Sequence, residues 1–301
     1  MVGGRRKVAA LRAHQPYFAM ASHIPASIRI IRGANRTLGR VAPSLASRLS
    51  RRIFSMPRKF TPREWELPFE VMGRRVRLPS GLSVLRAGDG PVVALIHGWE
   101  GRATQFAAMA PALLDRGFSV VAIDAPGHGH SRGRQSDPYR FAEALIEVST
   151  QFGPLHAAVG HSMGGGSIAL ALSSGLVVAR AALIASPSSL HDVLHRFSAA
   201  VQLPPKATDH FVRDAHRRIA ARGYRTDDIE GALRSVHVPA LVIHAVDDKE
   251  VPFADAERIA GFWPGSTLLP VEHVGHRRIL RDPVTISAVA DFVAAGAVSA
   301  G

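Results

Sequence analysis

The sequence predicts an α/β fold with a mostly parallel central sheet and helices on both faces. From about Pro68 onwards, short apolar runs alternate with longer helical segments, the pattern of strands joined by helical crossovers. One run leads into Gly160-His161-Ser162-Met163-Gly164 and then into a small-residue helical stretch. Polar residues also follow two later runs, just past the strand ends where open parallel sheets place their sites.

The first 63 residues differ in composition from the rest of the chain. They hold 14 of the 37 Lys and Arg residues and no Asp or Glu, so 23 basic residues remain beside all 24 acidic ones. The excess charge therefore belongs to a basic leader, and a nucleic-acid-binding function for the whole protein loses its support. We expect residues 1–19 to be disordered. The acid-free, Arg-rich composition would also fit an organellar transit peptide, and Arg5-Arg6 would fit an export signal less well.

Within this leader, about residues 43–54 predict a short amphipathic helix. Leu45, Leu49 and Ile53 recur every four residues, with arginines off that line. Packing of this stripe on the body of the protein is the simpler expectation. The alternative is weak peripheral contact with an anionic membrane surface.

After the leader, the expected elements follow one another along the chain. Residues 64–187 and 237–301 form the α/β core, and the polar helical segment 188–236 interrupts it as a small cap. Expected strands are Phe69–Met72, Leu82–Leu85, Val92–His97, Phe118–Asp124, the run before Gly160, Ala181–Ala185, Ala240–Ala245 and Thr267–Val271. Expected helices are Gln105–Asp115, Tyr139–Phe152, the stretch after Gly164, Phe253–Phe262 and Pro283–Ala295.

Ser162 is the candidate nucleophile. In a Gly-x-Ser-x-Gly turn between strand and helix, Gly160 and Gly164 leave room for neighbouring chain while strain lifts the hydroxyl out of the sheet edge. A serine hydroxyl near neutral pH needs a base within hydrogen-bond reach. A structural serine in a helix N-terminal turn is the alternative reading.

The base and the acid are expected in the order Ser, acid, His. His276 follows a glycine after the run Thr267–Val271, and imidazole has a pKa near working pH. Asp248, after the run that ends at Val246, would hold the imidazole in the correct tautomer. Asp247 and His273 are the competitors for these two roles.

These motifs together resemble the α/β-hydrolase superfamily from about Pro68 to the C-terminus. The segment His97-Gly98-Trp99 resembles the oxyanion segment of that family, and Asp124 to Ser131 resembles its D-x-x-G-x-G-x-S loop. Asp248 to Pro252 resembles its D-x-x-V-P acid turn, and Gly275-His276 its histidine loop. The resemblance implies backbone oxyanion donors at Met163 and Trp99. Asp124 is expected to brace the loop beside the nucleophile, and Trp99 is equally well explained as a core aromatic.

The resulting expectation is a serine hydrolase that cleaves a carboxylic ester through an acyl-enzyme, with a small acyl compound as substrate. Thioesterase, amidase, lactonase or acyltransferase chemistry on the same triad stays open, as does a non-catalytic binding protein with this fold. No organic cofactor or metal is expected, because His128-Gly129-His130 has no further ligand beside it. The chain has no cysteine, which excludes disulfides and a thiol nucleophile, and no apolar run near the ~18 residues of a membrane span. We expect a cytoplasmic protein.

Overall fold

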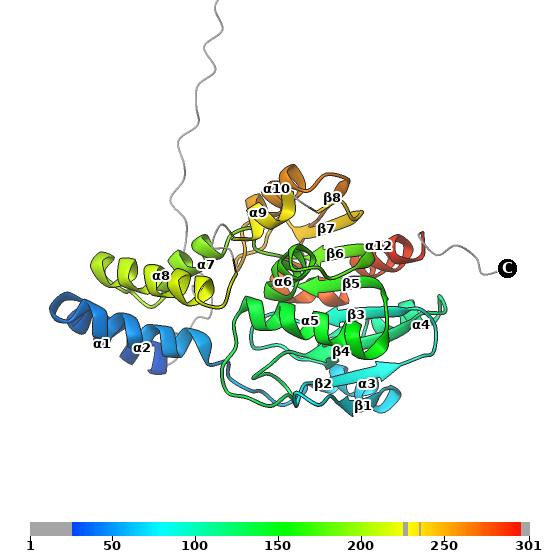
Figure 1. The fold of residues 1–301 in the computed structure, drawn as a ribbon, viewed down its shortest axis with the longest axis horizontal. Coiled ribbons are helices and arrows are strands. Elements are labelled where there is room, and N and C mark those ends of the chain that lie inside the picture. Colours follow the sequence, from blue (N-terminus) through cyan, green and yellow to red (C-terminus); the bar gives the residue numbers. More distant parts are fainter. Residues whose placement is uncertain (1–25, 225–227, 235, 296–301) are drawn as a thin grey trace, which may run out of the picture.

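The computed structural model describes residues 26–224, 228–234 and 236–295 and contains one eight-stranded sheet (Figure 1). The strand order is β1-β2-β4-β3-β5-β6-β7-β8; β2 runs antiparallel to both of its neighbours, and all other pairs are parallel. The predicted α/β class is therefore confirmed. The strands are β1 (Arg74–Arg77), β2 (Ser83–Ala87), β3 (Val92–Ile96), β4 (Ser119–Asp124), β5 (Leu155–His161), β6 (Val178–Ile184), β7 (Ala240–Ala245) and β8 (Ser266–Val271).

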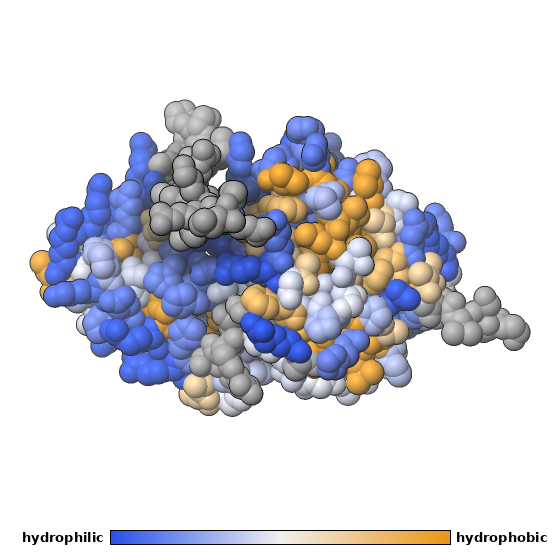
Figure 2. Space-filling model, turned by 90° about the horizontal axis from the view of Figure 1, so that it is seen from above, coloured by the Kyte–Doolittle hydropathy of each residue, from blue (hydrophilic) through white to orange (hydrophobic). Residues whose placement is uncertain are grey.

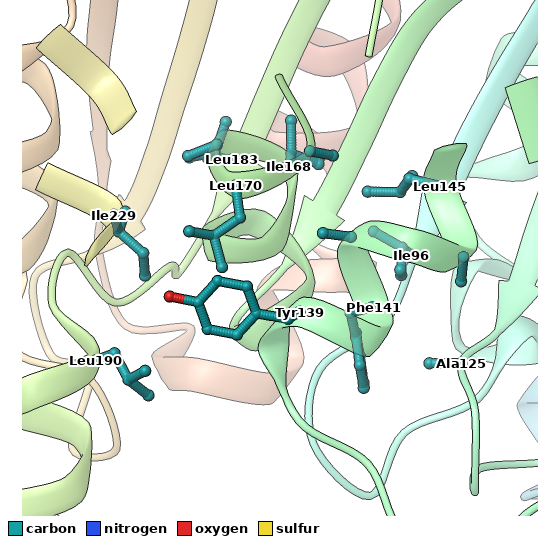
Figure 3. Packing of buried hydrophobic residues seen from close by; sticks show 14 of the residues in the cluster. Ile96, Ala125, Tyr139, Phe141, Leu145, Ile168, Leu170, Leu183, Leu190 and Ile229 are labelled. Carbon is teal, nitrogen blue, oxygen red and sulfur yellow. The ribbon is translucent and has the colours of Figure 1, made fainter. Parts of the chain in front are cut away.

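Helices cover both faces of this sheet, and each face has its own apolar core. One core contains side chains of α5, α6, α10 and the helices inserted between β6 and β7; Figure 3 shows Tyr139, Leu170, Leu190 and Ile229 of this core gathered around one another. The other core contains side chains of α3, α4 and α12. The helices of the sheet region are α3 (Leu67–Met72), α4 (Ala110–Leu114), α5 (Pro138–Phe152), α6 (Met163–Ser173), α10 (Phe253–Phe262), α11 (Gly275–Arg278) and α12 (Pro283–Ala294), with 3-10 turns at Glu64–Glu66, Ala103–Phe106 and Ile279–Arg281.

One expected strand near the start of the sheet is wrong. Phe69–Met72 lies in helix α3, because only Phe69 enters the core while Val71 stays 86% exposed. In a strand, Phe69 and Val71 would lie on the same face, so one could not be fully buried while the other is almost fully exposed. The first strand is instead Arg74–Arg77, an edge strand without an apolar run, which pairs only with β2 among the described residues.

The expected helix Gln105–Asp115 is divided. A 3-10 turn at Ala103–Phe106 precedes α4, which begins at Ala110. Pro111 explains the break, since proline lacks an N–H and its ring clashes with a helical carbonyl four residues earlier. Proline is tolerated in the first turn of a helix, which is where Pro111 lies.

Beyond the sheet, helices from two distant parts of the chain pack together (Figure 1). The insertion between β6 and β7 contains α7 (Leu190–Ala200), α8 (Pro205–Ala220) and α9 (Asp228–Arg234). The N-terminal segment contains α1 (Ala26–Val41), which the sequence analysis did not predict, and α2 (Pro43–Ser55), which it did. Residues 1–19 of the leader, for which a disordered start was expected, lie outside the described residues.

Polar contacts join these helices. The buried Asn35 amide donates to the carbonyl of Val201 at 2.9 Å, and the Arg32 guanidinium donates to the carbonyl of Ala200 at 2.8 Å. Arg51 of α2 forms an ion pair of 3.1 Å with Asp214 of α8. The N-terminal helices are thus attached to the insertion rather than forming a separate tail.

Helix α2 packs through a different face from the one its sequence suggests. Leu45, Leu49 and Ile53 are 46%, 48% and 41% exposed. The side that faces the protein carries the buried Ala46, Ser47 and Ser50, with partly buried Phe54 near its end. The expectation that the leucine stripe packs on the body is therefore wrong, because small side chains form the contact and allow close helix approach.

An aromatic cluster closes the contact between α2, α7 and α8. The Phe54 ring lies edge-on to Phe197 of α7 and Phe211 of α8, with ring centroids 4.9 and 5.6 Å apart. Its other neighbour is Trp99, stacked at 6.1 Å in the loop after β3. Edge-to-face pairs of this kind add stability beyond the area they bury.

No helix in the described part of the chain is long and apolar enough to cross a bilayer.

We predict that Phe211→Ala lowers the free energy of unfolding by about 3–5 kcal/mol, because Phe211 is fully buried and its loss leaves a cavity. Phe60→Ala, at a ring that is 51% exposed, should cost less than about 1 kcal/mol. Urea denaturation followed by circular dichroism measures both. Equal losses for the two variants would contradict the packing described here.

Candidate active site

Ser162 lies in a strained turn between β5 and α6. Its backbone has φ 53° and ψ −122°, a region that residues with a side chain rarely adopt. A Cβ added at Gly164 would lie 2.4 Å from the carbonyl oxygen of Ile96, and one at Gly160 would lie 2.5 Å from the amide nitrogen of Gly165. The two glycines of the motif therefore allow a turn that no larger residue could make.

Hydrogen bonds hold this strained backbone in place. The Ser162 N–H donates to the carbonyl of Ile184 on the adjacent strand β6 at 2.8 Å. The Ser162 carbonyl accepts from the amides of Gly165 and Gly166 at 3.0 and 3.3 Å. Strain of this kind persists only where surrounding structure imposes it, which is the case here.

His276 and Asp248 form a hydrogen-bonded pair. The Nδ1 atom of His276 lies 2.7 Å from Oδ2 of Asp248, and both side chains are buried, with 6% and 0% exposure. The other carboxylate oxygen, Oδ1, accepts the backbone N–H groups of Glu250 and Val251 at 2.7 and 2.9 Å. The imidazole therefore has an acceptor fixed in position by main chain.

The pKa of Asp248 is well below its usual value. Burial alone would raise this pKa, but hydrogen bonds from His244, His276 and the Val251 amide outweigh that effect. The carboxylate accordingly stays ionised at neutral pH. It can then stabilise a positive charge on His276.

The competing residues occupy other positions. Asp247 is exposed, and its carboxylate accepts the N–H of Gly275 at 3.2 Å. The His273 side chain is 92% exposed and lies 3.8 Å from Glu272. Of the two candidate acids and two candidate bases, the structure joins Asp248 to His276.

Two contacts bring the serine turn, the histidine loop and the loop after β3 together. His161, the residue before Ser162, has its Nε2 atom 2.8 Å from the carbonyl oxygen of His276, and the two rings lie 4.8 Å apart. A Cβ on Gly98 would lie 2.8 Å from the Ser162 Cβ, so the segment that follows β3 lies directly against the serine. Ser162 itself is 4% exposed.

The backbone of this region offers N–H groups beside the serine. Met163 is the first residue of α6, so no helical carbonyl precedes it to accept its N–H. The positive end of the helix dipole lies at the same place. Trp99 follows Gly98 and is partly buried, with its ring against Phe54 and edge-on to His128 at 5.1 Å. The Trp99 side chain thus lies at a helix contact and not in the sheet core.

Asp124 and His97 tie the neighbouring loops together. The buried Asp124 carboxylate accepts the amides of Ala103 and His130 at 2.8 and 3.0 Å and the Arg75 guanidinium at 2.8 Å. His97 accepts the Ala125 N–H at Nε2, which leaves Nδ1 to donate to the carbonyl of Gly98 at 2.6 Å. These contacts fix the two segments that follow β3 and β4.

Sequence reasoning missed two histidines beside the site. His161 contacts the His276 loop, and His244 of β7 lies fully buried with Nε2 3.4 Å from Asp248 Oδ2 and 3.0 Å from the Val251 carbonyl. Each is a polar residue near the end of an apolar strand, at the edge where the site forms. That position was the available signal for both.

Three buried histidines near the site are neutral at physiological pH. Burial lowers the pKa of His97 to about 4 and those of His128 and His161 to about 3. Neighbouring imidazoles contribute, His97 to His128 and His276 to His161. The unfolded chain would protonate all three near pH 6.5.

Comparison with known proteins places the fold. The family model described as alpha/beta hydrolase fold matches residues 91–227. A pimeloyl-[acyl-carrier protein] methyl ester esterase of Stenotrophomonas maltophilia is 28% identical over 251 residues, covering 69% of this chain and 95% of the relative. A bifunctional esterase/perhydrolase of Acinetobacter calcoaceticus is 28% identical over 214 residues, covering 55% of this chain and 77% of the relative.

Solved structures agree with this fold. An esterase from Exiguobacterium antarcticum superposes with a TM-score of 0.56 at 21% identity, covering 74% of this chain and 99% of that one. A bromoperoxidase from Bacillus anthracis gives the same TM-score at 18% identity, covering 73% and 99%. The curated relatives are distant enzymes that include esterases.

Stability should fall as the pH drops from about 6.5 to about 4. In that window the unfolded state binds protons at the three histidines while the folded state does not, so protonation favours unfolding. Because all three histidines are neutral in the folded state and protonated in the unfolded state, the free energy of unfolding should change by about 4 kcal/mol per pH unit. His128→Gln should reduce the slope by roughly a third. Urea titrations at a series of pH values measure the slope; a flat profile in the unsubstituted protein would refute the prediction.

Proposed function

We propose that this chain, which has the α/β-hydrolase fold, is a serine hydrolase that cleaves a carboxylic ester through an acyl-enzyme intermediate. The Asp248–His276 hydrogen bond at 2.7 Å, on a loop held against the Ser162 turn, is the observation that carries this proposal. Esterase activity among the distant relatives supports the same reaction class.

In the proposed reaction, Ser162 Oγ attacks the acyl carbon while Nε2 of His276 takes the hydroxyl proton. Asp248 accepts the Nδ1–H and stabilises the imidazolium that forms. The imidazolium then gives its proton to the leaving alkoxide, and the alcohol departs. Water attacks the remaining acyl-serine with His276 again as base, which releases the acid and restores the serine hydroxyl.

Backbone N–H groups are proposed to stabilise the negative charge on the tetrahedral intermediate. Met163 at the start of α6 and Trp99 after Gly98 are the donors, since the two segments meet at Ser162. Loss of one such donor typically costs about 3 kcal/mol in the barrier. Because only main chain is used, the Trp99 ring is free to contact substrate.

Helices α7, α8 and α9 are proposed to act as the cap, with α1 and α2 as an added layer. Phe54 and Trp99 meet where this layer contacts the oxyanion segment. Aromatic surface beside a nearly buried serine favours an apolar acyl or alcohol group in the substrate. A panel of nitrophenyl esters of graded chain length measures that preference.

Ser162→Ala should abolish both nitrophenyl ester hydrolysis and labelling by a fluorophosphonate probe, because the probe phosphonylates an activated serine. Ser167→Ala is the matched control, since the Ser167 hydroxyl is bound to the Met163 carbonyl inside α6. Gel fluorescence reports labelling. A signal that survives Ser162→Ala would remove Ser162 from the nucleophile role.

Asp248→Asn should lower kcat by about 10⁴-fold, because an amide holds the imidazole in the wrong tautomer. Asp247→Asn changes the adjacent, exposed carboxylate in the same way and should leave kcat within about threefold, as expected for a surface substitution. Steady-state kinetics on one nitrophenyl ester compares the pair. The reverse order of the two effects would assign the acid to Asp247.

A further inference from the structure

Two adjoining open clefts lie between helix α2 and the loop that leads into α5. The first, of about 350 Å³, is lined by Arg48, Leu49, Arg51, Arg52 and Gln135. The second, of about 340 Å³, shares Arg52 and Gln135 and adds Met56, Arg134 and Arg140. Five arginines and no acidic residue line the combined surface, which we call the arginine cleft.

Much of the positive charge in the arginine cleft has no acidic partner. Arg51 is paired with Asp214 at 3.1 Å, and Arg140 lies 3.7 Å from Asp137. Asp137 is itself engaged by Arg222 at 2.8 Å. Across the described residues, Arg48, Arg52 and Arg134 form no ion pair, and all three are exposed.

The same helix presents apolar side chains beside the cleft. Leu49 lines the first cleft and belongs to the exposed row formed with Leu45 and Ile53. The helical segment 26–55 contains seven arginines and no acidic residue. In Figure 2, which views the molecule from above, the end where α8 lies over α1 and α2 is mostly hydrophilic. Unpaired cations next to an apolar row form an amphiphilic surface, not a simply solvated one.

We propose that the arginine cleft binds the phosphate groups of anionic lipids and that Leu45, Leu49 and Ile53 enter the headgroup boundary of the bilayer. Guanidinium groups suit phosphate because their planar fork donates two parallel hydrogen bonds. The apolar row decides between a lipid and a soluble phosphate compound, since only the lipid offers an apolar region next to its anionic group. Each arginine near an anionic surface adds binding, so the contact is electrostatic and reversible.

Docking through the exposed row leaves the contacts on the opposite side of α2 unchanged. Phe54 points to Trp99, Phe197 and Phe211, away from the exposed row. One helix thus has a lipid face and a face toward the candidate active site. The binding does not depend on catalysis, so it can be tested whether or not Ser162 is the nucleophile.

Co-sedimentation of the full-length protein with phosphatidylcholine vesicles that contain phosphatidylglycerol tests the proposal. We expect binding to these vesicles, little binding to pure phosphatidylcholine, and release by high salt. Arg48→Gln/Arg52→Gln should lower the partition coefficient roughly 30-fold. Leu45→Ser/Leu49→Ser should also lower it, with hydrolysis of a soluble nitrophenyl ester unchanged in both variants.

The matched control is Arg74→Gln/Arg86→Gln, a cross-strand pair on β1 and β2 at the other end of the molecule. This variant carries the same charge change and should bind vesicles as the unsubstituted protein does. If the control and cleft variants lost vesicle binding equally, net charge alone would explain the binding, and the proposal would be overturned. Stabilisation by inorganic phosphate without vesicle binding would assign the cleft to a soluble anion, and would overturn it as well.

Discussion

The hydrogen bond between His276 and Asp248 is the interaction on which the candidate site depends. His276 lies in the short helix α11 after β8 and Asp248 in the loop after β7, and these two strands are parallel neighbours with Ala245 paired to Val271. Parallel pairing brings the C-terminal ends of both strands to one edge, so the loops must meet there. Main-chain amides on Asp248 and the side chain of His161 then fix each partner. In this buried setting the bond is stronger than it would be in water.

The glycines around Ser162 are the complementary constraint. Gly164 allows α6 to start against the end of β3, and Gly98 allows the next loop to touch the serine. Close approach at these two points brings the N-terminus of α6 and the segment after Gly98 to the same side of Ser162. The proposed backbone donors depend on that approach and not on particular side chains.

The α/β class with a mostly parallel sheet and the candidate positions of Ser162, Asp248 and His276 could be predicted because each follows from a local pattern, whereas the order of the strands could not. Apolar runs mark strands, and Ser162, Asp248 and His276 lie one, three and five positions beyond the ends of β5, β7 and β8. Helix α3 and the edge strand β1 could not be predicted in this way, because Phe69 alone is buried and β1 has no apolar run. The D-x-x-V-P pattern already favoured Asp248 over Asp247, and the structure joins Asp248 to His276. The outward direction of Leu49 could not be predicted without the tertiary contacts. A helix with small residues on one side and leucines on another can bury either side.

The most direct test of the central claim is proton NMR of the Nδ1–H of His276. If Asp248 accepts this hydrogen bond in a buried site, a low-field exchange-protected resonance should be present in the unsubstituted protein and in Ser162→Ala. The same resonance should be lost in Asp248→Asn and retained in Asp247→Asn. Its absence from the unsubstituted protein, or its persistence in Asp248→Asn, would contradict the account.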